Sequence, residues 1–162
     1  MSDIQDENHL IEERKKKLKE LKKNGINYPN SFRRSNLSMP LIEDYSEFSK
    51  EELSEKNISV SVAGRIMLRR VMGKASFSTI QDMTGRIQLY LRQDTIDNYE
   101  LFKDCDLGDI IGAKGVLFKT NTGELSIQVN EFNLLTKSLR PLPEKHLGLS
   151  DVCLLYTSDA AD

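Results

Sequence analysis

The chain has 162 residues, of which 38% are hydrophobic and 30% are charged, and its formal net charge is −2. This length suits one medium domain or a small domain with appendages, and the composition is typical of a soluble protein with a modest core. No apolar run reaches the roughly 18 residues of a membrane span. The first apolar cluster, Leu10 and Ile11, is followed by charged residues. We therefore expect neither a membrane span nor a signal peptide, and a cytoplasmic location.

The N-terminal 57 residues are predicted to be a helical extension. We expect residues 1–8 to be disordered, and residues 10–23 to form an amphipathic helix that ends at Asn24-Gly25. Residues 10–24 hold seven Lys or Arg against three Glu. The helix is interpreted either as a solvated helix tethered to the domain or as one that lies along a phosphate backbone. One or two short helices are predicted within residues 41–56, where Ser49, followed by Glu51 and Glu52, is a start signal.

From residue 58 the hydrophobic pattern changes to period two. It predicts five strands, at about residues 58–72, 77–83, 86–92, 110–119 and 125–135, with tight turns at Thr84-Gly85 and at residues 121–123. Changes of parity predict bulges near residues 69–70 and 130–131.

A helix is predicted between the third and fourth strands. It carries Ile96, Tyr99 and Phe102 on one side, and Asp94 or Thr95 is expected to cap it. This order of elements indicates a mainly β protein in which residues 58–137 form a five-stranded OB-fold, a Greek-key barrel whose middle strands and loops bind oligonucleotides.

The second and third strands carry the candidate binding site. Side chains alternate between the two faces of a strand, so Phe77 points opposite to Ile80, and Gln88 points opposite to the core residue Leu89. Phe77 is therefore an outward aromatic among polar side chains, and a flat unpaired base is a good candidate for its partner. The candidate binding residues are Phe77 for stacking, Gln88 and Glu124 for base edges, and Arg65, Arg69, Arg70 and Lys74 for phosphates or edges.

Each of these residues also has a structural interpretation. Phe77 could pack under the N-terminal helix, Gln88 could be ordinary surface, and Glu124 could pair with Lys119. The sequence contains no Gly-rich phosphate loop, no nucleophile with a base and no metal-ligand cluster, and the two cysteines and two histidines are interpreted as incidental. We expect binding, with no catalytic residues and no metal site.

Four segments of this sequence resemble a known family. They are AGRIMLRRVMGKASFSTIQD, GRIQLYLR, DLGDIIGAKGVLFKTNTGELSI and LLTKSLRPLPEKHLGLSD. They are similar to the N-terminal anticodon-binding domain of bacterial class II lysyl-tRNA synthetases, and the resemblance runs from about Leu10 to Val152. It implies that Phe77 stacks on the central uracil of the anticodon, that Gln88 bonds the edge of this base with help from Arg70, and that Glu124 lies near the other anticodon bases.

The resemblance also implies what lies outside the barrel. In the family, a linker matching residues 138–152 leads to a catalytic domain. That domain uses ATP and Mg²⁺ to attach lysine to its tRNA, and it forms most of a homodimer interface. That domain is absent from this sequence, so we expect the fragment to be inactive alone. Residues 153–162 match the translation of a common sequencing adapter and are interpreted as foreign. The open alternatives are a generic single-strand-binding OB-fold and an OB-fold that binds a protein partner.

Overall fold

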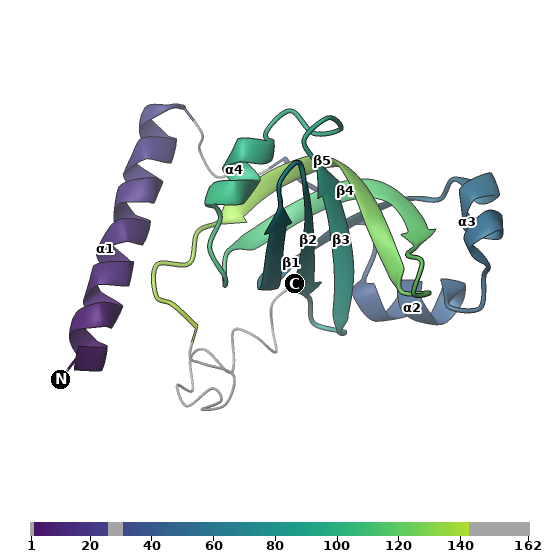
Figure 1. The fold of residues 1–162 in the computed structure, drawn as a ribbon, viewed down its shortest axis with the longest axis horizontal. Coiled ribbons are helices and arrows are strands. Elements are labelled where there is room, and N and C mark those ends of the chain that lie inside the picture. Colours follow the sequence, from purple (N-terminus) through teal and green to yellow (C-terminus); the bar gives the residue numbers. More distant parts are fainter. Residues whose placement is uncertain (1, 26–30, 143–162) are drawn as a thin grey trace.

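The computed structural model describes residues 2–25 and 31–142, and its centre is a closed barrel of five strands (Figure 1). The expected linker beyond residue 142 and the tail at 153–162 lie outside the described residues. The strands are β1 (Ser59–Met72), β2 (Ala75–Gln81), β3 (Arg86–Arg92), β4 (Ile110–Lys119) and β5 (Leu125–Thr136). They follow the order β1-β2-β3-β5-β4, and β1 also pairs with β4 to close the ring. The OB-fold prediction is therefore confirmed.

The long first strand closes the barrel by pairing on both sides. Its first half, from Ser59 to Arg65, pairs with β4, and its second half, from Arg65 onward, pairs with β2. The register between β1 and β2 shifts between Ile66 and Leu68, so the bulge lies at Met67, closer to the crossover than the predicted 69–70. The bulge predicted near residues 130–131 is confirmed by the register shift between β4 and β5 there.

The barrel core is built from the alternating apolar residues of its strands. In β2 and β3 every second side chain is buried, which confirms the predicted faces. Phe102 of α4 (Tyr99–Asp104) is fully buried, and its ring packs edge-on against Phe132 at 5.7 Å between centroids. Ile96 and Tyr99 are buried as predicted. The helix begins later than expected, with Asn98 at its N-cap, and Asp94 pairs with Arg92 at 2.5 Å.

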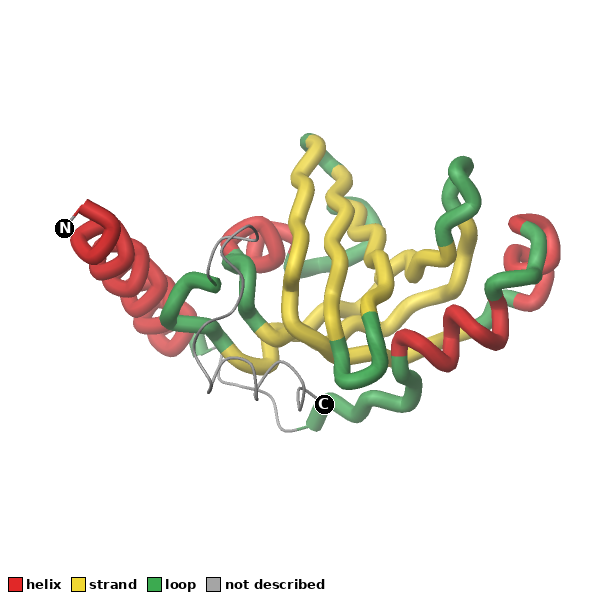
Figure 2. The backbone as a smooth tube through the Cα atoms, turned by 90° about the horizontal axis from the view of Figure 1, so that it is seen from below, coloured by secondary structure: helices red, strands yellow, loops and turns green. Residues whose placement is uncertain are grey.

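The described residues form three further helices outside the barrel: α1 (Ser2–Lys23), α2 (Ser38–Tyr45) and α3 (Lys50–Lys56). Helix α1 lies at one end of the barrel, and α2 and α3 lie at the other (Figures 1 and 2). The predicted start of α3 is confirmed by a reciprocal capping box between Ser49 and Glu52. The prediction that residues 1–8 are disordered is wrong. Helix α1 begins at Ser2, and residues 2–8 contain no Gly or Pro that would interrupt it.

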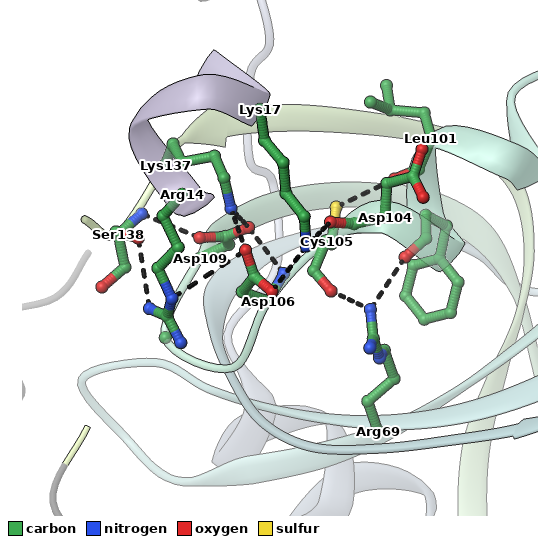
Figure 3. Close-up of polar contacts among 12 residues, drawn as sticks. Arg14, Lys17, Arg69, Leu101, Asp104, Cys105, Asp106, Asp109, Lys137 and Ser138 are labelled. Carbon is green, nitrogen blue, oxygen red and sulfur yellow. Dashed lines mark hydrogen bonds and ion pairs between the residues drawn. The ribbon is translucent and has the colours of Figure 1, made fainter. Parts of the chain in front are cut away.

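An ionic cluster fixes α1 to the barrel (Figure 3). It consists of Arg14 and Lys17 of α1 together with Asp106, Asp109 and Lys137. Lys17 Nζ lies 3.0 Å from Asp106 Oδ1, and Lys137 Nζ lies 2.6 Å from Asp106 Oδ2 and 2.8 Å from Asp109 Oδ2. Burial acts to raise the pKa of Asp106, but its two lysine partners outweigh burial and hold this pKa below its usual value. Two basic residues of α1 are therefore paired with an acidic residue of the barrel.

Asp82 attaches α2 to the β2–β3 turn. One carboxylate oxygen accepts hydrogen bonds from Ser38 N and Ser38 Oγ, each at 2.7 Å. The other accepts from Thr84 N at 2.8 Å, Thr84 Oγ1 at 2.7 Å and Gly85 N at 3.1 Å. Burial acts to raise the pKa of Asp82, but the hydrogen bonds from Thr84 and Ser38 outweigh it and lower the pKa. The folded protein therefore favours the ionised carboxylate.

This shift predicts a pH dependence of stability. The folded pKa of Asp82 lies below the unfolded value of about 3.9, so its stabilising contribution is complete above that pH and is lost as the pH falls through the folded pKa. Replacing Asp82 by Asn should lower the free energy of unfolding at pH 7 by about 1.5–3 kcal/mol. Urea unfolding of both proteins at pH 7, 5 and 3 checks this. The difference should be similar at pH 7 and 5 and smaller under acid conditions, and a constant difference down to pH 3 would contradict it.

Candidate nucleic-acid interface

A groove of about 590 Å³ crosses the outer face of β1, β2 and β3 and reaches the turn between β4 and β5. No residue of α1 lines it, so Phe77 does not pack under that helix. The lining residues are Leu68, Arg69, Arg70, Met72, Phe77, Ser78, Thr79, Gln88, Thr120, Asn121, Thr122 and Glu124. Five of the predicted site residues, from four separate segments of the chain, therefore line this groove: Arg69, Arg70, Phe77, Gln88 and Glu124.

Strand register places an aromatic pair beside the groove. Phe77 lies directly opposite Arg70 of β1 on one side and Tyr90 of β3 on the other. The rings of Phe77 and Tyr90 have centroids 4.9 Å apart and planes tilted by 35°. Phe77 is half-buried and lines the groove, so one side of the ring is supported while another remains accessible. A supported, accessible ring of this kind can stack on an unpaired base.

The amide of Gln88 is oriented by a hydrogen bond from the neighbouring strand β5. Ser126 of β5 lies opposite Gln88 in the parallel β3–β5 pair, and its Oγ donates to Gln88 Oε1 at 2.8 Å. The amide NH₂ has no partner among the described residues and can donate into the groove. Gln88 is therefore set to recognise an acceptor, such as a carbonyl oxygen on the edge of a base.

Glu124 closes the groove from the β4–β5 turn. Gly123 adopts φ 86°, a conformation that favours glycine, and Thr120 Oγ1 accepts a hydrogen bond from Glu124 N at 3.1 Å. The carboxylate is exposed and forms no ion pair within the described part of the chain. Lys119, the alternative partner considered from the sequence, donates to the Ser46 carbonyl instead. Glu124 can therefore accept a hydrogen bond from a base N–H.

The predicted cationic residues fall into two groups. Arg70 is exposed at the groove, and Lys74 is exposed in the turn between β1 and β2. The predicted contact of Arg65 with phosphates is not supported. Arg65 is only 7% exposed, and its Nη1 donates to the Gly108 carbonyl at 2.8 Å, so it cannot reach a phosphate. Arg69 Nη1 donates to the Lys103 carbonyl at 2.8 Å and to that of Cys105 (Figure 3). Arg69 therefore holds α4 against β1, whereas the side chains of Arg70 and Lys74 form no hydrogen bond or ion pair within the described residues.

Two residues of this interface were missed from the sequence. Tyr90 could have been found, because the predicted hairpin already places it across from Phe77. Ser126 could not, because the parallel β3–β5 contact joins segments that are far apart in the chain.

Other kinds of site find little support in the described residues. They contain no group of three or more His, Cys, Asp or Glu that could hold a metal ion. None of their helices is long and apolar enough to cross a membrane. Burial raises the pKa of the Cys105 thiol to about 12, so this thiol is protonated at neutral pH.

The fold and groove define a nucleic-acid-binding OB-fold, and residues 60–135 match the family described as an OB-fold nucleic acid binding domain. The chain is 56% identical over 158 residues to the lysine–tRNA ligase of Legionella pneumophila (strain Lens), covering 97% of this chain and 32% of that protein. It is 57% identical to the lysine–tRNA ligases of Nitrosomonas europaea over 149 residues (91% and 30%) and Idiomarina loihiensis over 155 residues (93% and 31%). The chain is therefore similar to lysine–tRNA ligases over almost all of its own length, and it spans about a third of the length of these relatives.

Proposed function

We propose that this domain reads the anticodon loop of a lysine tRNA, with the central uridine stacked on Phe77. The observation that carries the proposal is the convergence of an aromatic ring, an oriented amide donor, a cation and a carboxylate on one groove. Sequence-specific RNA recognition commonly uses this combination, because single-stranded bases stack on aromatic rings and expose their edges to hydrogen bonding.

The orientation of Gln88 suggests how uracil is selected. Its free NH₂ donates to a carbonyl oxygen of the base, while its Oε1 is occupied by Ser126. At position 4, uracil presents an oxygen acceptor where cytosine presents an amino donor, by analogy with thymine and cytosine in DNA. With cytosine, the amino group of the base would therefore face the NH₂ group of Gln88, and both of these groups are donors. Glu124 then accepts from a base N–H, and Arg70 contacts the same nucleotide or its phosphate.

The wider role follows from the family relation and is part of the same proposal. In the whole protein, a catalytic region outside the described residues would use ATP and Mg²⁺ to join lysine to the tRNA that this domain selects. That protein would act in the cytoplasm as a homodimer. The fragment would supply only the selection of the tRNA.

Discrimination at the central base tests the proposal. Binding of an anticodon stem-loop with a UUU triplet should be about five- to 150-fold tighter than binding of the same loop with UCU, because the mismatched donor costs about 1–3 kcal/mol. Fluorescence anisotropy with both labelled RNAs at one salt concentration measures the ratio. Replacing Gln88 by Ala should reduce the preference. Equal affinity for the two loops would support generic single-strand binding and overturn the proposed specificity.

A further inference from the structure

A second hollow lies next to the groove, on the other side of the aromatic pair. It measures about 590 Å³ and is lined by Lys74, Ala75, Tyr90, Arg92, Gln93 and Asp94. Phe77 lines the groove and Tyr90 lines this hollow, and the two rings are in contact at 4.9 Å between centroids. The pair is therefore a shared wall that presents one aromatic residue to each space.

The second hollow has the chemistry of a nucleotide subsite. Tyr90 is half-buried, and its hydroxyl has no hydrogen-bond partner among the described residues. Arg92 is engaged by Asp94 at 2.5 Å, which neutralises that edge of the hollow. Lys74 is exposed and forms no ion pair within the described ranges, so its ammonium is available for a phosphate. An aromatic ring beside a free cation is the arrangement with which OB-folds hold single-stranded nucleic acid.

We propose that this hollow, the Tyr90 subsite, binds a nucleotide that flanks the one on Phe77 in the same RNA strand. The base packs against Tyr90, and a phosphate lies at Lys74. The contact between Phe77, which lines the groove, and Tyr90, which lines the hollow, carries this inference, which rests on the proposed function of the groove. Successive bases of one strand can occupy neighbouring aromatic platforms, whereas two independent ligands would have no reason to share a wall.

Tyr90 has another conceivable role, which is to support Phe77 without touching RNA. The two roles predict different RNA bases whose removal would abolish the effect of a Tyr90 substitution on binding. If Tyr90 contacts a flanking base, removal of that base abolishes the effect of a Tyr90 substitution. If Tyr90 acts only through Phe77, removal of the central base abolishes it instead. A double-mutant cycle between protein and RNA separates these cases.

The experiment combines Tyr90→Leu with four versions of the UUU stem-loop: unmodified, abasic at the central position, and abasic at either neighbour. Tyr90→Leu should weaken binding of the unmodified loop by about five- to 150-fold, and Tyr90→Phe, which keeps the ring, should stay close to wild type. With one of the flanking abasic loops, Tyr90→Leu and wild type should bind with about the same Kd. With the central abasic loop, Tyr90→Leu should still bind more weakly than wild type. An effect that disappears only with the central abasic loop would overturn the subsite.

A second measurement does not depend on how well Tyr90→Leu folds. Lys74→Ala should make the salt dependence of binding shallower, by about 0.7 in the slope of log K against log salt, while Lys103→Ala, an exposed lysine outside both spaces, should leave it unchanged. Equal slopes for Lys74→Ala and wild type would contradict the phosphate contact.

If the groove does not bind the RNA, this is recognised separately, because Phe77→Ala would then bind the unmodified loop as tightly as wild type.

Discussion

Replacing Phe77 by alanine is expected to weaken binding of the UUU anticodon stem-loop by about five- to 150-fold, since stacking of a base on an aromatic side chain contributes about 1–3 kcal/mol. The ring is half-buried, supported by Tyr90 at 4.9 Å and open to the groove. Alanine removes the platform without introducing a charge or a steric conflict. Fluorescence anisotropy with the labelled stem-loop gives the change in Kd directly.

The matched control is Phe77→Tyr, which keeps a flat ring of the same size. It should bind close to wild type, whereas Phe77→Leu, which keeps apolar bulk without the flat ring, should resemble the alanine variant. Thermal unfolding followed by circular dichroism shows whether each variant is folded. An alanine variant that unfolds at a lower temperature yet binds RNA with wild-type affinity would show that Phe77 serves packing alone.

The interface on β2 and β3 could be predicted because side-chain direction in a strand depends only on parity. Once Ile80 and Leu89 are assigned to the core, Phe77 and Gln88 must face outward, and the tight turn at Thr84-Gly85 fixes which residues lie opposite each other. These are local constraints, separated by only a few residues. The face of the barrel that carries the site therefore follows from the sequence.

The contributions of the arginines could not be predicted in the same way. Arg65, Arg69 and Arg70 look alike in a basic run, but their environments come from distant segments. Arg65 is buried where β1 changes partner from β4 to β2, and it donates to the Gly108 carbonyl, while Arg69 donates to carbonyls at the end of α4. Only Arg70 remains exposed at the groove. Such assignments require the tertiary structure, because nothing within the run distinguishes its members.

The same limit applies to the charged segments. The sequence shows a basic N-terminal helix and an acidic stretch that ends at Asp109, but not that they meet. In the structure Arg14 and Lys17 turn toward Asp106, so part of the positive charge of α1 serves its attachment to the barrel. Arg14 Nη1 also donates to the carbonyls of Ser138 and Arg140, each at 3.2 Å. Helix α1 therefore fixes the path of the chain as it leaves the last strand.

Asp109 should be the most sensitive position of the ionic cluster, and Asp109→Ala is expected to lower the free energy of unfolding by about 3–5 kcal/mol. The Asp109 residue is 0% exposed. It accepts hydrogen bonds from Lys137 Nζ and Ser138 N, each at 2.8 Å, and from Asp106 N at 2.9 Å. Burial lowers the pKa of Arg65, and the charge of Asp109 opposes this shift. Alanine removes the carboxylate and leaves these buried donors with less compensation.

Urea unfolding at pH 7 measures this loss, and Asp104→Ala is the matched control. Asp104 is exposed, and only its backbone carbonyl contacts α1, through Lys17 at 3.3 Å, so its substitution should change stability by less than about 0.5 kcal/mol. The double variant Asp109→Leu with Lys137→Met should recover part of the loss, because it removes both members of the buried pair. If Asp109→Ala were no less stable than Asp104→Ala, the buried pair of Asp109 and Lys137 would contribute nothing to the stability of the fold.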